Sequence, residues 1–111
     1  MTERSSAHNL VDRFSNYLIA VRRLSRNTVE AYSRDIVKYV RFVESQESKH
    51  LQDCERLDLL LFLNSEQKNG LSSRSISRIM SSIKSFYSFL ESDGVLKSNP
   101  FIDVQTPKAE Q

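Results

Sequence analysis

The segment Leu71–Leu90, LSSRSISRIMSSIKSFYSFL, carries the pattern that decides the fold. Its apolar residues recur at intervals of three and four, which places them on one face of an α-helix. These residues are Ile76, Ile79, Met80, Ile83, Tyr87 and Leu90, with Phe86 and Phe89 widening the stripe. The segment therefore predicts a long amphipathic helix that packs on the core of a helical domain.

The polar face of this helix has an unusual composition. Arg74, Arg78, Ser81 and Ser85 project from it, and no acidic residue occurs before Glu91. A short, donor-rich and positive face is able to approach phosphates and base edges without a carboxylate to repel them. The alternative is a solvated surface that happens to be rich in serine. These residues alone leave both interpretations open.

Length and composition limit the class of protein. The 111 residues suffice for one domain with a modest core, and 39% hydrophobic with 27% charged residues is typical of a globular unit. No apolar run is long enough to span a bilayer, and the start does not resemble a secretory signal. We therefore expect a single-domain cytoplasmic protein.

The sequence predicts no metal, cofactor or catalytic site. Cys54 is the single cysteine, which we interpret as a packing residue, and His8 and His50 are isolated from it. No Gly-x-Gly pattern for a phosphate-binding loop occurs, and nothing locates Ser, His and Asp side chains together. The tyrosines lie on or beside apolar stripes and are interpreted as core residues with polar tips. They are Tyr17, Tyr32, Tyr39 and Tyr87.

The net charge is only +2, so the distribution of charge is more informative than its total. Acidic residues gather in the middle of the chain, at Glu44, Glu47, Asp53, Glu55 and Asp58. Basic residues lie in two other places, at Arg22, Arg23 and Arg26 and at Arg74, Arg78 and Lys84. The folded chain can thus have one basic side and one acidic side while staying almost neutral overall.

Hydrophobic periodicity predicts three further helices. The first covers about residues 8–22, with inward-facing Leu10, Phe14, Tyr17, Leu18 and Val21. The second runs from an N-cap at Ser25 to about Ser45, with inward-facing Val29, Tyr32, Ile36, Tyr39, Val40 and Val43. The third spans about residues 55–69 around Leu57, Leu60, Leu61 and Leu63, with Leu59 and Phe62 also apolar. Because it is apolar around much of its circumference, we expect the third helix to be the most buried.

Several residues predict where the helices begin and end. Gly70 and Gly94 each precede an apolar residue, which is typical of a left-handed residue just after a helix. Ser72 is predicted to cap the fourth helix, and Leu51 to pack back onto the core from a loop over residues 46–54. In the first turn of the second helix, Arg26, Asn27 and Thr28 are suited equally to capping and to phosphate contact.

Two segments together resemble a known domain. Leu24-Ser25-Arg26-Asn27-Thr28, followed by Tyr32, Asp35 and Ile36, matches one helix of it. The fourth helix matches more strongly, through Ser72, Arg74, Ser75-Ile76, Arg78, Ser81, Ile83, Lys84-Ser85-Phe86-Tyr87 and Phe89-Leu90. Gly94, the Asn99-Pro100 pair and Pro107-Lys108 continue the pattern. The chain thus resembles the N-terminal core-binding, or SAM-like, domain of tyrosine recombinases and phage integrases, most closely the Xer type.

This sequence departs from the pattern at three positions. Ser75 stands where the family usually has threonine, Lys84 where arginine is common, and Ser88 where a basic residue is frequent. These residues keep hydrogen-bonding capacity and remove some positive charge. The departures therefore bear on how strongly the chain binds DNA.

The resemblance implies an all-α fold, a four-helix orthogonal bundle of the SAM-like type, over residues 8–104. Residues 1–7 are expected to be a disordered N-terminus, and residues 105–111 the start of a linker to a catalytic domain absent from this chain. The second and fourth helices are expected to face the major groove of double-stranded DNA, as one half of a clamp around a recombination site. The cleaving tyrosine belongs to the separate C-terminal domain, so we expect this chain to bind DNA without cutting it.

The resemblance also implies partners and contact residues. The full-length parent is expected to assemble as a tetramer on DNA, with no membrane, no small-molecule substrate and no cofactor. DNA contacts are predicted from Arg26, Asn27, Thr28 and Arg34 of the second helix and from Arg74, Arg78 and Lys84 of the fourth. Further hydrogen bonds to DNA, of secondary importance, are predicted from Ser72, Ser73, Ser77, Ser81 and Ser85. The alternative function is a stand-alone helical protein-interaction module, whose partner is acidic or binds through Phe86 and Phe89.

Overall fold

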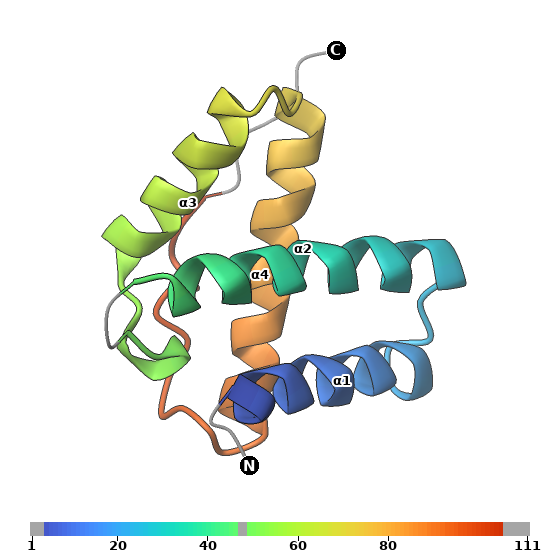
Figure 1. Cartoon of the computed structure of the whole chain (residues 1–111). Coiled ribbons are helices and arrows are strands. Elements are labelled where there is room, and N and C mark those ends of the chain that lie inside the picture. Colours follow the sequence, from blue (N-terminus) through green and yellow to red (C-terminus); the bar gives the residue numbers. More distant parts are fainter. Residues whose placement is uncertain (1–3, 47–48, 106–111) are drawn as a thin grey trace.

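The computed structural model describes residues 4–46 and 49–105, and these form helices without strands. The elements are α1 (Arg4–Ala20), α2 (Arg26–Glu44), the short 3-10 helix η1 (Leu51–Asp53), α3 (Arg56–Lys68) and α4 (Ser73–Ser92) (Figure 1). The all-α prediction with four helices is confirmed. The first helix starts at Arg4 rather than near residue 8, so it includes part of the segment expected to be disordered. Residues 106–111 of the expected linker lie outside the described residues.

The helices cross in two directions. α1 and α2 run antiparallel to each other, and α4 passes across both of them, whereas α3 lies at the edge of the bundle (Figure 1). α2 packs against both α1 and α4, and α3 packs against α4 and α2. This arrangement is the expected orthogonal bundle, and it makes the crossing of α2 with α4 its central contact.

The inward face of α4 supplies the centre of the core. Its residues Ile79, Met80, Ile83, Phe86, Tyr87 and Leu90 are all buried, as the periodicity predicted. The Phe86 ring lies 5.2 Å from that of Phe14 in α1, and Phe89 lies 5.1 Å from Tyr17. Phe86 and Phe89 are therefore core residues, and the idea that they bind an apolar partner is wrong.

Two buried tyrosines connect three elements through their hydroxyl groups. The Tyr87 hydroxyl donates to the Leu51 carbonyl at 2.8 Å, and it lies 3.0 Å from the Tyr39 hydroxyl, which is left to donate to it. Burial raises the pKa of both phenols far above their ordinary value. Leu51 is buried beneath them, as expected. Tyr39 and Tyr87 are thus core residues with satisfied polar tips.

Cys54 lies beside this pair. Its thiol donates to the His50 carbonyl at 3.5 Å, and burial raises its pKa. A thiol held in its protonated form is a poor nucleophile and a poor metal ligand. The structure therefore agrees with the interpretation of Cys54 as a packing residue.

α3 differs from its prediction. Leu59, Phe62 and Leu63 are buried, but Leu57, Leu60 and Leu61 on the other side are exposed. A peripheral helix with neighbours on one side buries only one face, whatever the composition of the other (Figure 1). The expectation that α3 would be the most buried helix was therefore wrong. Val21, expected to face inward, is also exposed, because α1 ends one residue before it.

Gly70 and Gly94 end helices α3 and α4, as predicted. Gly70 and Gly94 have φ angles of +97° and +81°. Leu71 N–H donates to the Glu66 carbonyl at 3.3 Å, and Val95 N–H donates to the Leu90 carbonyl at 2.9 Å. These bonds close Schellman motifs that end α3 and α4.

Candidate nucleic-acid interface

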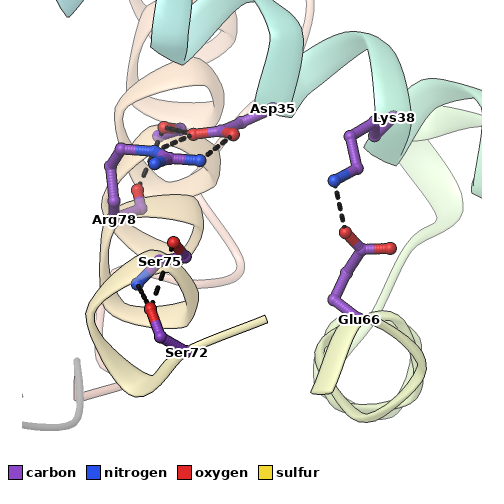
Figure 2. Close-up of polar contacts among 7 residues, drawn as sticks. Asp35, Lys38, Glu66, Ser72, Ser75 and Arg78 are labelled. Atoms are coloured by element: carbon purple, nitrogen blue, oxygen red, sulfur yellow. Dashed lines mark hydrogen bonds and ion pairs between the residues drawn. The ribbon is translucent and has the colours of Figure 1, made fainter. Parts of the chain in front are cut away.

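The first turn of α4 begins as the sequence predicted. Ser72 is the N-cap, and its hydroxyl oxygen accepts a hydrogen bond of 3.2 Å from the Ser75 N–H (Figure 2). Ser73 and Arg74 follow in the exposed first turn, which contains no acidic residue. The positive end of the helix dipole and the Arg74 guanidinium therefore reinforce each other at this end of α4. Ser77, one turn further, is half-buried.

Arg78 is engaged within the protein. Its Nε and Nη2 donate to the two oxygens of Asp35 in α2, at 2.9 and 2.7 Å, and Ser82 Oγ lies 2.8 Å from the same carboxylate (Figure 2). Asp35 is 2% exposed, whereas the Arg78 side chain is 38% exposed. The hydrogen bond to Asp35 raises the pKa of Arg78. Arg78 therefore joins α2 to α4, a role that the sequence analysis did not assign to it.

A second cation of α2 is also engaged by a buried carboxylate. Lys38 Nζ lies 2.6 Å from Oε1 of Glu66, which is buried on α3 (Figure 2). Together with the Arg78–Asp35 pair, this contact joins α2 to α4 and to α3. One cation of α2 and one of α4 are thus paired with buried carboxylates.

The sequence analysis missed the structural role of Asp35 and Ser82 as partners of Arg78 and of each other. The available signal was Asp35 itself, which lies between Tyr32 and Ile36 in a stripe of inward-facing residues. A carboxylate at such a position requires a cation or several donors close by. The sequence does not say which of its sixteen Lys and Arg residues is that cation.

Three predicted contact residues do lie together. Ser81, Lys84 and Ser85 line a depression of about 340 Å³, together with Arg22 from the turn between α1 and α2. The remaining lining residues are Tyr17, Tyr32, Ser88 and Ile102. The described residues around this depression thus supply two cations and several hydroxyl groups without a carboxylate. Such a set suits a phosphate group.

Lys84 also holds the segment that follows α4. Its Nζ donates to the Val104 carbonyl at 2.7 Å, and the Asn99 amide donates to the Lys84 carbonyl at 3.1 Å and to Ser88 Oγ at 2.9 Å. Phe101, held by the Asn99 side chain, is buried against Tyr87. Phe101 and Val104 are thus part of the core, whereas Ile102 is exposed.

The start of α2 contributes a separate group of predicted residues. Arg26 and Asn27 are exposed and Thr28 is half-buried. Thr28 N–H donates to Ser25 Oγ at 3.2 Å, and the Ser25 hydroxyl donates to Thr28 Oγ1 at 2.9 Å, so Thr28 takes part in capping. This end of α2 lies at the right of Figure 1, beyond the crossing with α4.

Arg34 is not brought together with the other predicted contacts. It lines a depression between α1 and α2, with Val11, Asp12, Ser15, Ser33, Val37, Lys38 and Arg41, to which α4 contributes nothing. The lining of this depression thus differs from that around Lys84. Arg34 therefore belongs to a different face from Ser81, Lys84 and Ser85.

The charges separate along α2. Exposed Glu44, Asp53 and Glu55 lie at the end of α2 and before α3, whereas Arg22, Arg23 and Arg26 lie at the other end of α2. These two ends are on opposite sides of Figure 1. Glu47 lies outside the described residues. Exposed Arg56 follows Glu55 and exposed Glu30 follows Arg26, so neither end carries charges of one sign only.

A metal site and a membrane-spanning helix are two further features to consider in the described part of the chain. No three of its His, Cys, Asp and Glu side chains gather closely enough to hold a metal ion. Within the same residues, none of the helices combines the length and the apolarity needed to cross a bilayer.

Comparison with known proteins adds an independent observation. Residues 11–94 match the family of the phage integrase N-terminal SAM-like domain. The tyrosine recombinase XerD of Listeria innocua is 36% identical over 107 residues, which cover 94% of this chain and 35% of that protein. The tyrosine recombinase XerC of Anoxybacillus flavithermus is 39% identical over 98 residues, covering 88% of this chain and 33% of the relative.

A tyrosine recombinase of Thermosipho africanus is 35% identical over 104 residues, or 89% of this chain and 35% of its own length. The chain thus spans about a third of the length of these relatives. No solved structure gives a significant match.

Proposed function

Because this chain belongs to the family of phage integrase N-terminal SAM-like domains, we propose that it is the DNA-binding arm of a site-specific tyrosine recombinase. In this role it forms one half of a clamp around double-stranded DNA at a recombination site. The strand-cleaving groups belong to a second domain of the parent protein. The arm itself supplies affinity for the DNA and orients the parent protein on it.

The depression lined by Arg22, Ser81, Lys84 and Ser85 is the observation that carries this proposal. Two cations from different elements converge there with hydroxyl donors, and a phosphate accepts from both kinds of group. Phosphate contacts position a protein on the duplex, and they leave other side chains of the same face to reach base edges. We assign the depression to the DNA backbone.

Arg74 and the start of α2 extend this surface. Arg74, Ser72 and Ser73 lie at one end of α4, and Arg26, Asn27 and Thr28 lie at the start of α2. Backbone N–H groups at both helix starts add positive potential. Arg78 acts in this proposal as a positioning residue, because its link to Asp35 sets how the two DNA-facing helices cross. Ser77 remains a predicted contact on α4, whereas Arg34, also a predicted contact, lies on a different face from the depression.

The parent protein is part of the proposal. We infer that it cuts and rejoins DNA as a tetramer in the bacterial cytoplasm, because the relatives are bacterial tyrosine recombinases about three times as long as this chain. The gene sequence beyond Gln111 tests this inference. A downstream series Arg, Lys, His-x-x-Arg, His or Trp and then Tyr supports it, and its absence from the gene contradicts it.

Binding of a DNA duplex to the chain tests the proposal directly. A few phosphate contacts predict a Kd of ~10⁻⁴ to 10⁻⁶ M that weakens steadily as salt increases. Amide signals of α4 and of the α1–α2 turn should shift in NMR spectra as DNA is added. Binding that is independent of salt, or shifts confined to α3, would contradict the proposal.

A matched pair of variants localises the contact. Arg74→Ala should weaken DNA binding, whereas the same change at Arg56, which is also exposed and begins α3, should leave it unchanged. Both side chains are exposed, so neither change should lower stability by more than ~0.5 kcal/mol. Equal losses from both variants would indicate attraction by net charge rather than a defined surface.

A further inference from the structure

The residues that follow α4 form a short ordered segment beside the depression around Lys84. We call residues 99–104 the strap. Phe101 of the strap is fully buried, and its ring lies 4.7 Å from that of Tyr87. Val104 is also buried, and its N–H donates to the Phe101 carbonyl at 3.1 Å. A segment that buries apolar side chains and pairs its own backbone is a fixed part of the domain.

Asn99 attaches the strap to α4. Its side chain is 5% exposed, and the amide nitrogen donates to the Lys84 carbonyl at 3.1 Å and to Ser88 Oγ at 2.9 Å. The amide oxygen accepts from the Phe101 N–H at 2.8 Å. Both the donor and the acceptor end of this buried amide therefore have partners. Asn99 thus joins the strap to α4 at Lys84, which carries a proposed phosphate contact.

The strap also reaches the depression itself. Exposed Ile102 lines it together with Lys84, Ser85 and Ser88. Lys84 Nζ donates to the Val104 carbonyl at 2.7 Å, so the strap holds the end of a long, flexible side chain. An ammonium group has three N–H donors, and it is therefore able to hold this carbonyl and a phosphate oxygen at the same time.

We propose that the strap is a positioning element of the phosphate site, that it acts through Lys84, and that Asn99 is its main positioning residue. The proposal rests on the function inferred above, since that function assigns a phosphate to the depression. A side chain that is already held has less freedom to lose when its ligand binds, so the strap should raise the affinity for DNA.

The coupling should also act in the opposite direction. An effect of one ordered element on a binding site is reciprocal, so a bound phosphate backbone should hold the strap more tightly. The strap directly precedes residues 105–111, which the sequence predicts to begin the linker. In the parent protein proposed above, the order of this connection should therefore depend on whether DNA is bound.

A double-mutant cycle on DNA affinity tests whether Asn99 acts through Lys84. Asn99→Ala should weaken binding of a labelled duplex by about two- to tenfold, which corresponds to the freedom of one long side chain. In the Lys84→Met background the same change should have no further effect, because no cation is left to position. A purely structural role of Asn99 predicts an equal loss in both backgrounds.

The control for lost stability is Tyr39→Phe. It removes a buried hydrogen bond to Tyr87 and belongs to neither the strap nor the depression, so DNA affinity should be unchanged. All affinities are compared at a temperature where circular dichroism melting curves show each variant to be folded. If Asn99→Ala does not fold, the exchange measurement on the wild type and Lys84→Met decides.

Hydrogen exchange of the strap amides tests the reciprocal effect in the 111-residue chain. A saturating duplex at low salt should slow the exchange of the Phe101 and Val104 N–H groups, which are bonded within the strap. The duplex should not slow it in Lys84→Met. Faster exchange would mean that phosphate competes with the Val104 carbonyl for Nζ, and it would overturn the proposal.

The outcomes separate this inference from the function on which it rests. A wild-type chain that does not bind DNA would overturn both. DNA binding with equal effects of Asn99→Ala in the two backgrounds, or with strap exchange that the duplex does not slow, would overturn the role of the strap alone.

Discussion

The two halves of the polar face of α4 use their cations differently. Arg78 gives two hydrogen bonds to Asp35, which is buried beneath it. About two turns further along, Lys84 lines an open depression with Arg22, to which no carboxylate contributes among the described lining residues. The comparison teaches that a cation on a helix face makes a positive surface only where no buried acid neutralises it. Arg78 in the first half joins α4 to α2, whereas Lys84 in the second half is the better candidate for binding a phosphate.

The largest effect is expected from Arg78→Ala. The variant leaves the buried Asp35 carboxylate with Ser82 as a donor and without its cation, so the free energy of unfolding should fall by about 2–3 kcal/mol. This estimate lies below the ~3–5 kcal/mol of fully enclosed pairs, because Arg78 is partly exposed and water is able to reach the site. Urea unfolding at neutral pH measures the loss.

A second substitution separates charge from packing. Adding Asp35→Asn to Arg78→Ala removes the unpaired charge and should recover part of the lost stability. The same Ala substitution at Arg74, on the same helix, should have almost no effect on stability. If the double variant is no more stable than Arg78→Ala alone, the guanidinium acts mainly through its packing.

The buried tyrosines make the free energy of unfolding depend on pH. Burial raises the folded-state pKa of Tyr39 and Tyr87 above the unfolded value of ~10, so the native state keeps protons that the unfolded chain releases. Their contribution is fully present below about pH 10 and is lost as pH rises above it, at about 1.4 kcal/mol per pH unit for each tyrosine. Unfolding free energies between pH 8 and 11 (roughly the range of phenol titration) should show this decline. Tyr39→Phe should reduce the slope, and an unchanged slope in that variant would argue against the assignment.

Arg22→Ala should change binding and leave stability unchanged. Arg22 is exposed in a turn and lines the depression with Lys84, so its removal takes away one proposed phosphate contact. The slope of log affinity against log salt should fall by about 1. Fluorescence anisotropy with a labelled duplex at several salt concentrations measures the slope. An unchanged slope would place the phosphate contact elsewhere on the surface.

Lys84→Met, in contrast, is expected to change both stability and DNA binding. Loss of the hydrogen bond to the Val104 carbonyl should lower stability by ~1 kcal/mol, and loss of the charge should weaken DNA binding. Lys84→Arg keeps the charge and the donors, so it should retain DNA binding. Lost binding in Lys84→Arg would indicate that the position of Val104, rather than the charge, matters most.

Local patterns predicted the fold well. The stripe through Ile79, Ile83 and Leu90 specified the buried face of α4, because helix geometry repeats over a few residues. Ser72, Gly70 and Gly94 predicted helix ends for the same local reason. α3 was misjudged because periodicity reports which faces are apolar, whereas the number of neighbouring helices decides which faces are covered.

The candidate site was only partly predictable. Ser81, Lys84 and Ser85 were predicted as contacts from their place on one helix, and they line one depression. Arg22 was recognised as basic but not as a neighbour of Lys84, since the two are far apart in sequence and meet only through the crossing of helices. The contact predictions themselves await the DNA measurements described above.

By itself, the sequence determined the four helices, the ends marked by Ser25, Gly70, Ser72 and Gly94, the buried face of α4 and the family to which the chain belongs, because all of these follow from local spacing and residue type. Only the tertiary structure decided which charges remain available. Asp35 occupies the guanidinium of Arg78, whereas no acid in the described lining faces Lys84 and Arg22. Electrostatic attraction depends on distance through space and on burial, and neither quantity is encoded in the position of a residue along the chain.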